Sequence, residues 1–565
     1  MPLNKKFITG LFILVFLVAC IRDQSSQQPS FSTTSPPNLI TNNGLAPKEV
    51  DTFTDGIIPI WAIQGESDQS PYLFQEVTTT GIVIGIFPKL EGFWIQGEDD
   101  QNDLTSNGLF IYSPKIDPSL NLGDLVQVEG VIHEPETETQ LFLKDLKILA
   151  PKQPLPDAIA LNPPGDRRAS EIYFESLEGM LVTVDGPARV VAPTDKYGET
   201  VVVLPSFKGS HLLQGSDIGM GIRVDDGKSS TYKNQKGMPF AAVTGDYLDN
   251  ILGPLAYTYG FYKIEPIEKP LLDRRPIVVD ALPETEANEF RVMTWNVENL
   301  FDDKVPFPSD TPIPTESEYR IWLEKIARTI LLADFPAVIA LQEVENIDVL
   351  EDLAENPILD KYRYQAVLVE GSDRRGIDVG YLVRGDVKVS NVQQFPAPDG
   401  LTPRPPLLLE VQIKLQTKTK SIYVLNNHFQ SMGAGELESQ PRRVAQAEWN
   451  VKLFKKILAK DPEAFVIILG DLNSYFDSPP IDVLRNNGLV HVFDQLSPDE
   501  RYTYIYQGIA QVLDHILISG GHANEISRVD ILHVNSDYPL QLPNDTSVFH
   551  KSDHDPVVVT FSGGK

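Results

Sequence analysis

Cysteine is nearly absent from this sequence, which contains only Cys20 among its 565 residues. A single cysteine excludes a disulfide within the chain and a zinc site built from several thiolates. It also excludes a thiol nucleophile other than Cys20 itself. Any catalysis or metal binding therefore has to rely mainly on carboxylate, amide, imidazole or hydroxyl groups.

Positive charge is also scarce, with 48 Lys and Arg against 78 Asp and Glu and a net charge of −30. This balance disfavours a surface covered with basic patches and slows the encounter with any polyanion. If nucleic acid is the substrate, bound cations or a small local basic patch have to offset the repulsion. The apolar fraction of 42% is that of an ordinary globular protein, and the length predicts two to three domains.

The N-terminal segment has the pattern of a signal peptide. An apolar run at residues 7–19 follows Lys5 and Lys6 and is too short to span a bilayer as a helix. It ends Leu-Val-Ala-Cys and resembles the lipobox of bacterial lipoproteins, which implies that residues 1–20 contain a lipoprotein signal peptide and that the Cys20 thiol is lipidated. An ordinary secretory signal is the alternative. We expect a bacterial cell-surface protein, anchored by lipid in the outer membrane of a diderm cell, or a secreted one.

Two further segments have no chemical motif. Residues 21–55 are rich in Ser, Gln, Pro, Thr and Asn without hydrophobic periodicity, so we predict a disordered tether. Residues 152–285 are rich in Gly and Pro and poor in helix signals, which predicts a second β-rich domain. A weak internal similarity favours a second OB-like unit there, and a β-rich spacer is the alternative.

Residues 56–151 alternate short strands with turns, which predicts a β domain. Three segments, residues 63–65, 92–96 and 105–110, resemble parts of the OB-like domain that precedes the catalytic domain in secreted bacterial nucleases. OB barrels bind nucleic-acid strands with aromatic side chains, and the candidates here are Trp94, Phe110 and Tyr112. We favour the alternative that these rings fill the barrel or its interface with the next domain.

From residue 288 to the end, strands alternate with helical stretches, which predicts one α/β domain. Polar clusters mark six strand boundaries of this region. They are Trp-Asn-Val-Glu-Asn at 295–299, Leu-Gln-Glu-Val-Glu at 341–345, Asn-His at 427–428, Gly-Asp-Leu-Asn at 470–473, Asp-His at 514–515 and Ser-Asp-His-Asp-Pro at 552–556. Carboxylates and amides without cysteine suit Mg²⁺, Mn²⁺ or Ca²⁺, and histidines near carboxylates suit acid–base catalysis. The combination predicts metal-assisted phosphoryl hydrolysis.

In this order and at these intervals, the motifs other than Asp-His at 514–515 resemble the endonuclease/exonuclease/phosphatase superfamily over about residues 288–563, within a predicted catalytic domain at 288–565. The resemblance implies a four-layer α/β sandwich, in which two packed mixed β-sheets are flanked by helices, with the site at the strand ends. Together with the OB-like segment, the chain resembles secreted bacterial extracellular nucleases. The implied activity is an extracellular metal-dependent phosphodiesterase that hydrolyses DNA, or RNA, to 5′-phosphate products.

The resemblance also implies a role for each motif residue. Glu343 is the main metal carboxylate for Mg²⁺ or Mn²⁺, with Ca²⁺ as a further candidate. Asn296, Glu298 and Asp553 lie near the metal or its waters. Asn296 additionally holds a phosphate oxygen, as does Asn473.

The remaining roles concern proton transfer and phosphate binding. His554, oriented by Asp514, contacts the scissile phosphate, and Asp471 holds or deprotonates the attacking water. Which of Asp471 and His554 is the general base stays open. His428 is the acid on the other side of the phosphate, oriented by Asp378.

Three positions bear on substrate affinity. Arg374 and Arg375 are candidates for a flanking phosphate, with a solvated loop as the alternative. Gln430 stands where extracellular relatives often carry a lysine, which implies one phosphate contact fewer. Two other functions stay open: a phosphoesterase of the same superfamily acting on phospholipid head groups, inositol phosphates or phosphomonoesters, and an adhesin with an inactive catalytic domain. The complete set of motif residues disfavours the adhesin.

Overall fold

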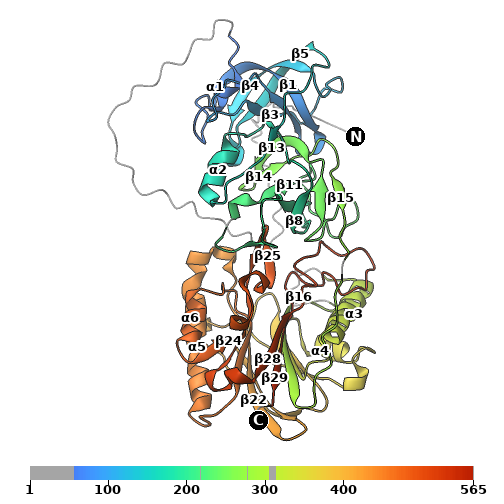
Figure 1. Ribbon diagram of the computed structural model, residues 1–565, viewed down its shortest axis with the longest axis vertical. Helices are drawn as coiled ribbons and strands as arrows, with labels where there is room; N and C mark the ends of the chain where they lie inside the picture. The colour runs from blue at the N-terminus through green and yellow to red at the C-terminus, as the bar shows by residue number, and fades with distance from the viewer. Residues whose placement is uncertain (1–55, 217, 277, 305–312, 564–565) are drawn as a thin grey trace, which may run out of the picture.

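The computed structural model describes residues 56–216, 218–276, 278–304 and 313–563, which form three domains stacked along the long axis (Figure 1). The predicted signal peptide, the lipidation site Cys20 and the predicted tether lie outside the described residues. Across the described ranges, no helix combines the length and the apolar character needed to cross a membrane.

The N-terminal domain is a closed five-stranded barrel with strand order β1-β2-β3-β5-β4. Its strands are β1 (Glu76–Phe87), β2 (Gly92–Gln96), β3 (Gly108–Tyr112), β4 (Leu125–His133) and β5 (Gln140–Ala150), and a short helix, α1 (Ile60–Gln64), precedes them. Val126 and Val128 alternate with more exposed neighbours because successive strand residues face opposite sides. Trp94 and Phe110 pack against Leu181 of the next domain, as favoured from the sequence, so they are not free to stack on a ligand.

The second domain is a nine-stranded sheet in the order β15-β12-β8-β9-β11-β14-β13-β7-β6. Its strands are β6 (Ile159–Ala160), β7 (Leu181–Thr183), β8 (Ala188–Ala192), β9 (Thr200–Val203), β11 (Ile222–Val224), β12 (Tyr247–Asp249), β13 (Leu252–Thr258), β14 (Phe261–Ile264) and β15 (Leu271–Asp273). Helix α2 (Arg167–Glu175) contributes Phe174 to the core that includes Val190, Val202 and Ile264. The domain is β-rich as predicted, but the structure shows this long sheet and not the second closed barrel that an OB-like unit would form.

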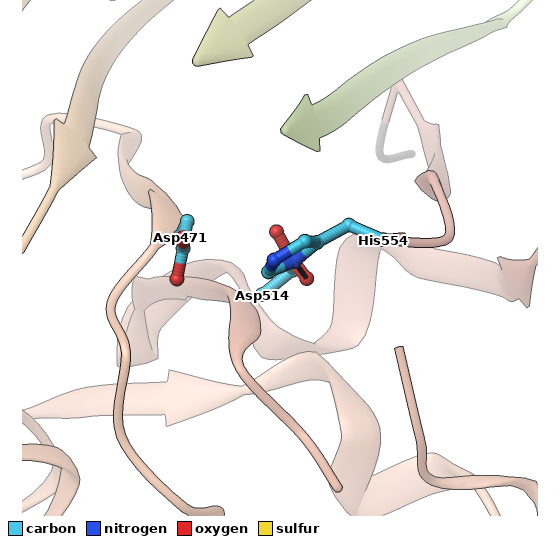
Figure 2. A group of neighbouring side chains, drawn as sticks. All are labelled: Asp471, Asp514 and His554. Atoms are coloured by element: carbon cyan, nitrogen blue, oxygen red, sulfur yellow. Dashed lines mark hydrogen bonds and ion pairs between the residues drawn. The ribbon is translucent and has the colours of Figure 1, made fainter. Parts of the chain in front are cut away.

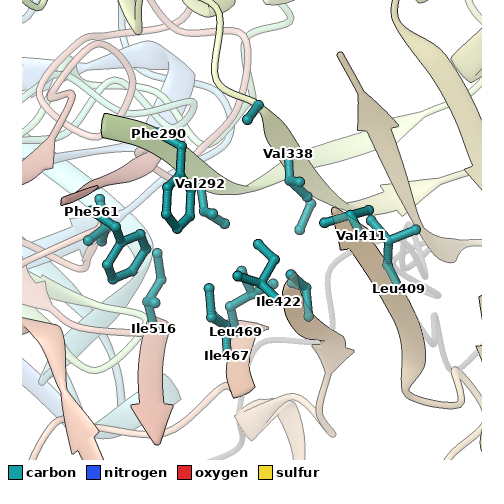
Figure 3. Packing of buried hydrophobic residues seen from close by; sticks show 14 of the residues in the cluster. Phe290, Val292, Val338, Leu409, Val411, Ile422, Ile467, Leu469, Ile516 and Phe561 are labelled. Carbon is teal, nitrogen blue, oxygen red and sulfur yellow. The ribbon is translucent and has the colours of Figure 1, made fainter. Parts of the chain in front are cut away.

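Two six-stranded mixed sheets form the centre of the C-terminal domain. The first, β18-β19-β17-β16-β29-β28, contains β16 (Glu289–Leu300), β17 (Val338–Val344), β18 (Gln365–Leu368), β19 (Asp378–Val383), β28 (Ile526–Ile531) and β29 (Val557–Ser562). The second, β20-β21-β22-β23-β27-β24, contains β20 (Lys388–Gln394), β21 (Leu407–Lys414), β22 (Thr419–His428), β23 (Val466–Asp471), β24 (Leu489–His491) and β27 (Asp514–Ser519). Figure 3 shows apolar side chains of both sheets meeting between them, including Phe290, Val338, Leu409 and Ile467.

Helices cover the outer face of each sheet. On the first sheet, α3 (Glu316–Leu332) and α4 (Ile347–Ala354) bury Ile326 and Leu350 against β16 and β17. On the second, α5 (Glu436–Leu458) and α6 (Pro479–Arg485) bury residues such as Phe454. The order helices, sheet, sheet, helices gives the predicted four layers (Figure 1).

Helix α5 differs from its prediction. The sequence favours a helix from residue 441, with Pro441 in the first turn, where a missing N–H does no harm. The helix begins instead at Glu436, so Pro441 lies inside it. The preceding residue, Gly435, has a φ of 101°, a conformation that glycine adopts more readily than other residues. The chain changes direction at this residue before the helix begins.

The junction between the barrel and the second domain buries two carboxyl groups. Glu138 and Glu178 are each 2% exposed. Glu138 accepts a hydrogen bond from the Tyr257 amide at 3.2 Å, and Glu178 accepts one from the Thr139 amide at 3.0 Å. Burial raises the pKa of Glu138 to about 7. Burial and then repulsion by Glu138 raise the pKa of Glu178 well above its usual value. Neutral carboxyl groups therefore suit this junction.

We expect the folded protein to lose stability as the pH rises from about 4.5 towards 7 because these two groups bind protons more tightly folded than unfolded. Glu178→Gln removes one of these groups. The melting temperature of the variant should therefore exceed that of the wild type at pH 8, and the difference should be smaller at pH 5. Thermal unfolding at both pH values measures this difference. Glu129→Gln, a change of an exposed residue on β4, is the matched control. A larger advantage of Glu178→Gln at pH 5 than at pH 8 would contradict the prediction.

Candidate active site

The polar motifs meet at one edge of the sandwich because of strand pairing. Strands β22 and β23 run parallel and place His428 beside Asp471, and the antiparallel pair β23–β27 places Asp471 beside Asp514. In the other sheet, β16 and β17 run parallel and pair Asn296 with Gln342. Since parallel neighbours end at the same edge of a sheet, the polar residues of both sheets gather there.

His554 and Asp514 form a buried pair at this edge (Figure 2). The His554 Nδ1 atom lies 2.7 Å from Asp514 Oδ2. Burial alone would lower the pKa of His554, but the charge and hydrogen bond of Asp514 hold it well above its usual value. The imidazole is therefore charged at neutral pH. The backbone oxygen of His554 accepts a hydrogen bond from Trp295 Nε1 at 2.9 Å, which fixes its loop to β16.

Asp471 lies between the two histidines. Its Oδ2 atom accepts a hydrogen bond from Asn296 Nδ2 at 3.0 Å and lies 3.4 Å from His428 Nε2. Its Oδ1 atom accepts the Asn473 amide at 2.9 Å, while the Asn473 side chain donates to the Phe429 carbonyl. Burial raises the pKa of Asp471 to about 7, and the charge of His554 limits this rise. A carboxylate with a pKa in this range can take up a proton near neutral pH.

Glu343 and His428 form the opposite side of the site. Glu343 Oε1 lies 3.8 Å from His428 Nε2, and Glu343 Oε2 accepts the Asn299 amide at 3.0 Å. Burial would raise the pKa of Glu343, but Arg375, whose guanidinium lies 3.2 Å from Oε2, lowers it. Burial and then the charges of Arg404 and Arg375 hold the pKa of His428 well below its usual value. Glu343 is thus an ionised carboxylate beside a neutral imidazole.

Three site residues have strained backbones. Glu298, Glu343 and Asn473 have φ values of 47°, 63° and 45°, in the left-handed region that non-glycine residues seldom adopt. Such conformations destabilise a fold by about 1–3 kcal/mol each and occur mostly where a site requires them. The strain therefore supports a functional edge at these strand ends.

The structure corrects one expectation about side chains near the site. Asp378 does not orient His428: its Oδ1 atom accepts a hydrogen bond from the Gly371 amide at 2.8 Å, and His428 Nδ1 has no hydrogen-bond partner among the described residues. Arg374 and Arg375 are both exposed, and Arg375 also bonds to Glu343 and Asn299. The amide of Gln430 donates to Gln446, which ties this position to helix α5.

Sequence reasoning missed three contributors. Arg404 pairs with Asp373 at 2.7 Å and donates to the Phe429 carbonyl, which places its charge near His428. Tyr504 forms a single backbone bridge with His554, and their rings are 4.8 Å apart. The buried Lys551 ammonium donates to the Val297 carbonyl at 2.6 Å, and burial lowers its pKa to about 8. Two of them gave a local signal: Lys551 directly precedes the Ser-Asp-His-Asp-Pro motif, and Tyr504 lies in an aromatic strand before the Asp-His motif.

The site contains donors of the kind that bind a divalent cation, and three of them lie close together. Asp471, Asp514 and His554 have ligand atoms within 4.8 Å of one another, and no other group of the described residues meets this criterion. The predicted ligands Glu343, Glu298 and Asp553 are thus not gathered as closely. Asp514 Oδ1 is buried without a partner, which leaves one oxygen lone-pair site unsatisfied. Buried carboxylates without cysteine are the donors that Mg²⁺ and Mn²⁺ prefer.

We expect Asp514→Asn to lower the pKa of His554 because the amide keeps the shape of the carboxylate and removes its charge. Burial, which lowers the pKa, is then opposed only by the charges of Asp553 and Asp471, so the pKa of His554 should fall. Proton-detected titration of ¹³C-labelled histidine rings in EDTA measures it, and His554→Ala assigns the signal. The exposed Asp494→Asn is the control. An unchanged His554 titration in Asp514→Asn would show that the 2.7 Å contact does not set the charge of this imidazole.

Comparison with known proteins gives two matches to protein families. Residues 291–536 match the model of a family described as the Endonuclease/Exonuclease/phosphatase family. Residues 165–275, most of the second domain, match a domain of unknown function. No curated protein matches the chain.

Solved structures match the C-terminal half. Truncated TDP2 from Caenorhabditis elegans is 18% identical, with 48% of this chain and 97% of that chain covered and a TM-score of 0.35. TDP2 from D. rerio, complexed with a single-strand DNA product, is 22% identical over 48% and 99% of the two chains, with a TM-score of 0.35. A mannosyl-6-phosphatase from Bacteroides thetaiotaomicron is 19% identical over 48% and 98%, with a TM-score of 0.33.

At these identities and scores, the solved structures do not bear on the substrate of this chain. The family match rests on the sequence of one domain, and it covers less than half of the chain. It coincides with the strand ends that carry Asn296, Glu343, His428 and Asp471. The part of the chain that is similar to the Endonuclease/Exonuclease/phosphatase family is therefore residues 291–536, which contain these strand ends.

Proposed function

We propose that this protein is a metal-dependent nuclease that hydrolyses phosphodiester bonds of DNA, with RNA as a second substrate, and leaves 5′-phosphate ends. The observation that carries the proposal is the pair of histidines with opposite pKa shifts around Asp471. A charged imidazole, a neutral imidazole and a carboxylate with a pKa of about 7 provide the donors and acceptors that phosphoryl hydrolysis needs at neutral pH.

The cation is proposed to bind on the Glu343 side of the site. His554 carries a proton on both ring nitrogens because Asp514 raises its pKa, so it is a poor metal ligand. The proposed ligands are the ionised carboxylate of Glu343 and the side-chain oxygen of Asn296, a residue whose Nδ2 atom donates to Asp471. Glu298 and Asp553 are proposed to act through water. When bound, Mg²⁺ or Mn²⁺ would withdraw charge from the phosphoryl oxygens.

The residues of the chain then have these roles. Asp471 is proposed to accept a proton from the attacking water, and it is favoured over His554 as the general base because His554 is already protonated. His554 donates a hydrogen bond to a phosphate oxygen, held in place by Asp514. Attack on phosphorus breaks its bond to the 3′ oxygen, which takes up a proton from solvent. The low pKa of His428 argues against the acid role expected from the sequence and favours a neutral hydrogen-bond donor.

The context of the domain favours a nuclease at the cell surface. The closed barrel is proposed to be an OB-like module, and the lipobox at Cys20 is proposed to anchor the chain to the outer membrane. In that location the enzyme would degrade extracellular nucleic acid. Phospholipid head groups, inositol phosphates and phosphomonoesters are the alternative substrates, and the assay below separates them.

We expect residues 21–565 to convert supercoiled plasmid to nicked and linear forms with Mg²⁺ or Mn²⁺ and to be inactive in EDTA. His554→Ala and Glu343→Ala should lower the rate by about 1,000-fold or more because each removes a group that acts on the phosphate or the cation. Glu129→Ala, on the exposed face of the barrel, should retain full activity. Agarose gels measure cleavage, with single-stranded DNA, RNA, bis-p-nitrophenyl phosphate and a phosphomonoester in parallel.

Full activity of a folded His554→Ala protein would contradict the assigned site. Turnover of the monoester or of a lipid head group with an intact plasmid would replace the nuclease by the alternative phosphoesterase.

Metal binding tests the proposed position of the cation without any turnover. Glu343→Gln should weaken Mn²⁺ binding by about tenfold or more because it removes the ionised carboxylate. Asp514→Asn should retain binding because its partner is His554. Isothermal titration calorimetry at pH 7.5 measures both. If Asp514→Asn weakens Mn²⁺ binding and Glu343→Gln does not, the ion binds at Asp471, Asp514 and His554 instead.

A further inference from the structure

Two histidines that the mechanism leaves unassigned, His491 and His515, form a buried pair behind the active site. Both residues are 0% exposed. His515 Nδ1 lies 2.8 Å from His491 Nε2, and His515 Nε2 lies 2.7 Å from the Ser474 carbonyl oxygen. The ring of His491 also packs against the rings of Phe476 and Phe493, with centroids 4.9 Å apart in each case. The pair therefore connects β24, through β27, to the loop that follows β23.

The hydrogen bonds fix which ring nitrogen of each histidine carries the proton. The Phe493 amide donates to His491 Nδ1 at 3.0 Å, so this nitrogen is unprotonated and the proton is on Nε2. His491 Nε2 then donates to His515 Nδ1, which leaves the proton of His515 on Nε2, where it is donated to the Ser474 carbonyl. Both rings are therefore neutral. Burial acts in the same direction, because it lowers the pKa of His491 well below its usual value and that of His515 to about 4.

Ser474 ends the loop that carries Asp471 and Asn473. Asn473 has a φ of 45°, a conformation that persists only where the surroundings hold it. Its amide donates to Asp471 Oδ1 at 2.9 Å, which fixes the loop before the strained residue. The bond from His515 to the Ser474 carbonyl fixes the loop after the strained residue.

The residues around the start of β27 contact both this loop and His554. The Leu513 carbonyl accepts a hydrogen bond from the Leu472 amide at 3.0 Å. The carboxylate of Asp514 lies 2.7 Å from His554 Nδ1. The side chain of His515 lies on the opposite face of the strand, because successive strand residues alternate, and there it contacts the loop. One short segment thus sets the position of His554 relative to the loop.

We propose that His515 is a positioning residue, whose hydrogen bond to Ser474 keeps the proposed general base Asp471 in place for attack on phosphorus. His491 holds the ring of His515 in the tautomer that donates. The proposal rests on the proposed hydrolytic function and gives two buried histidines a role in it. Loss of the bond would shift the loop without removing a group that touches substrate or cation, so it would slow the reaction and leave binding intact.

His515→Leu and His515→Gln test this role in residues 21–565. Leucine keeps much of the buried volume without a donor, whereas glutamine has an N–H group that reaches about as far as Nε2 and keeps the bond to Ser474. For His515→Leu, kcat should fall about 100-fold, the scale of a misplaced catalytic group. Its KM and its Mn²⁺ affinity should stay at the wild-type values. His515→Gln should recover most of the lost rate.

His522→Leu is the matched control. The Nε2 atom of His522 also contacts a carbonyl oxygen, that of Glu463 at 3.0 Å, but it does so at the opposite end of β23 from Asp471. This variant loses the same kind of bond far from the loop, so it should retain the wild-type kcat.

Two measurements in EDTA report the loop without any turnover. Hydrogen exchange of a peptide that contains residues 471–476 should be faster in His515→Leu than in the wild type and in His515→Gln, because the amides lose their fixed positions. Long-range ¹H–¹⁵N spectra of the wild type should show the proton of His515 on Nε2, with His515→Gln used to assign the signal.

The wild-type kcat in a folded His515→Leu protein would overturn the positioning role. So would a rate loss that His515→Gln shares in full, or a His515 ring that carries its proton on Nδ1. A wild type that cleaves no nucleic acid would overturn the nuclease assignment instead. The rate with the phosphoesterase substrate and the hydrogen exchange would then still decide the role of His515.

Discussion

The hydrogen bond between Asp514 and His554 is the interaction on which the site depends. Both residues are buried, and a charged imidazole in such a place is stable only with a carboxylate partner. The resulting positive charge in turn makes it possible to bury Asp471 close by, because it offsets part of the desolvation of that carboxylate. Removal of one member would leave the others as unpaired buried groups.

Polar side chains connect the two sheets below this pair. Asn296 of the first sheet donates to Asp471 of the second, and Gln342 donates to Asn426 at 2.7 Å in the same way. Asn426 also donates to the carbonyls of Leu341 and Gly380. Since an unsatisfied buried amide is destabilising, these bonds fix how one sheet lies over the other. The apolar side chains between the sheets contribute the buried surface area that holds the sheets together. The amides fix the relative alignment of the sheets, on which the distances between catalytic groups depend.

The second domain extends this alignment beyond the catalytic domain. Its strand β10 (Leu212–Leu213) continues the sheet of a hairpin formed by β25 (Tyr504–Tyr506) and β26 (Ile509–Gln511). The position of Tyr504 next to His554 therefore depends on contacts made by both domains. Asp537 illustrates the link, because it lies close to His211 of the second domain and accepts a hydrogen bond from Tyr502 of the catalytic domain. The second domain thus helps to position residues beside the site without carrying any of the polar motifs.

Local sequence patterns determined the order of domains, most strands and the motif residues. Apolar runs followed by polar residues predict buried strands with polar ends, as at residues 465–473. Within this strand Gly470 has a φ of 124°, and a Cβ atom there would lie 2.0 Å from the Asn427 carbonyl oxygen. Only the tertiary structure decided that Asp378 binds the Gly371 amide and that Arg404 and Tyr504 join the site. These are contacts between residues far apart in the chain, and hydrophobic periodicity carries no information about which polar side chains of different strands, loops or domains meet.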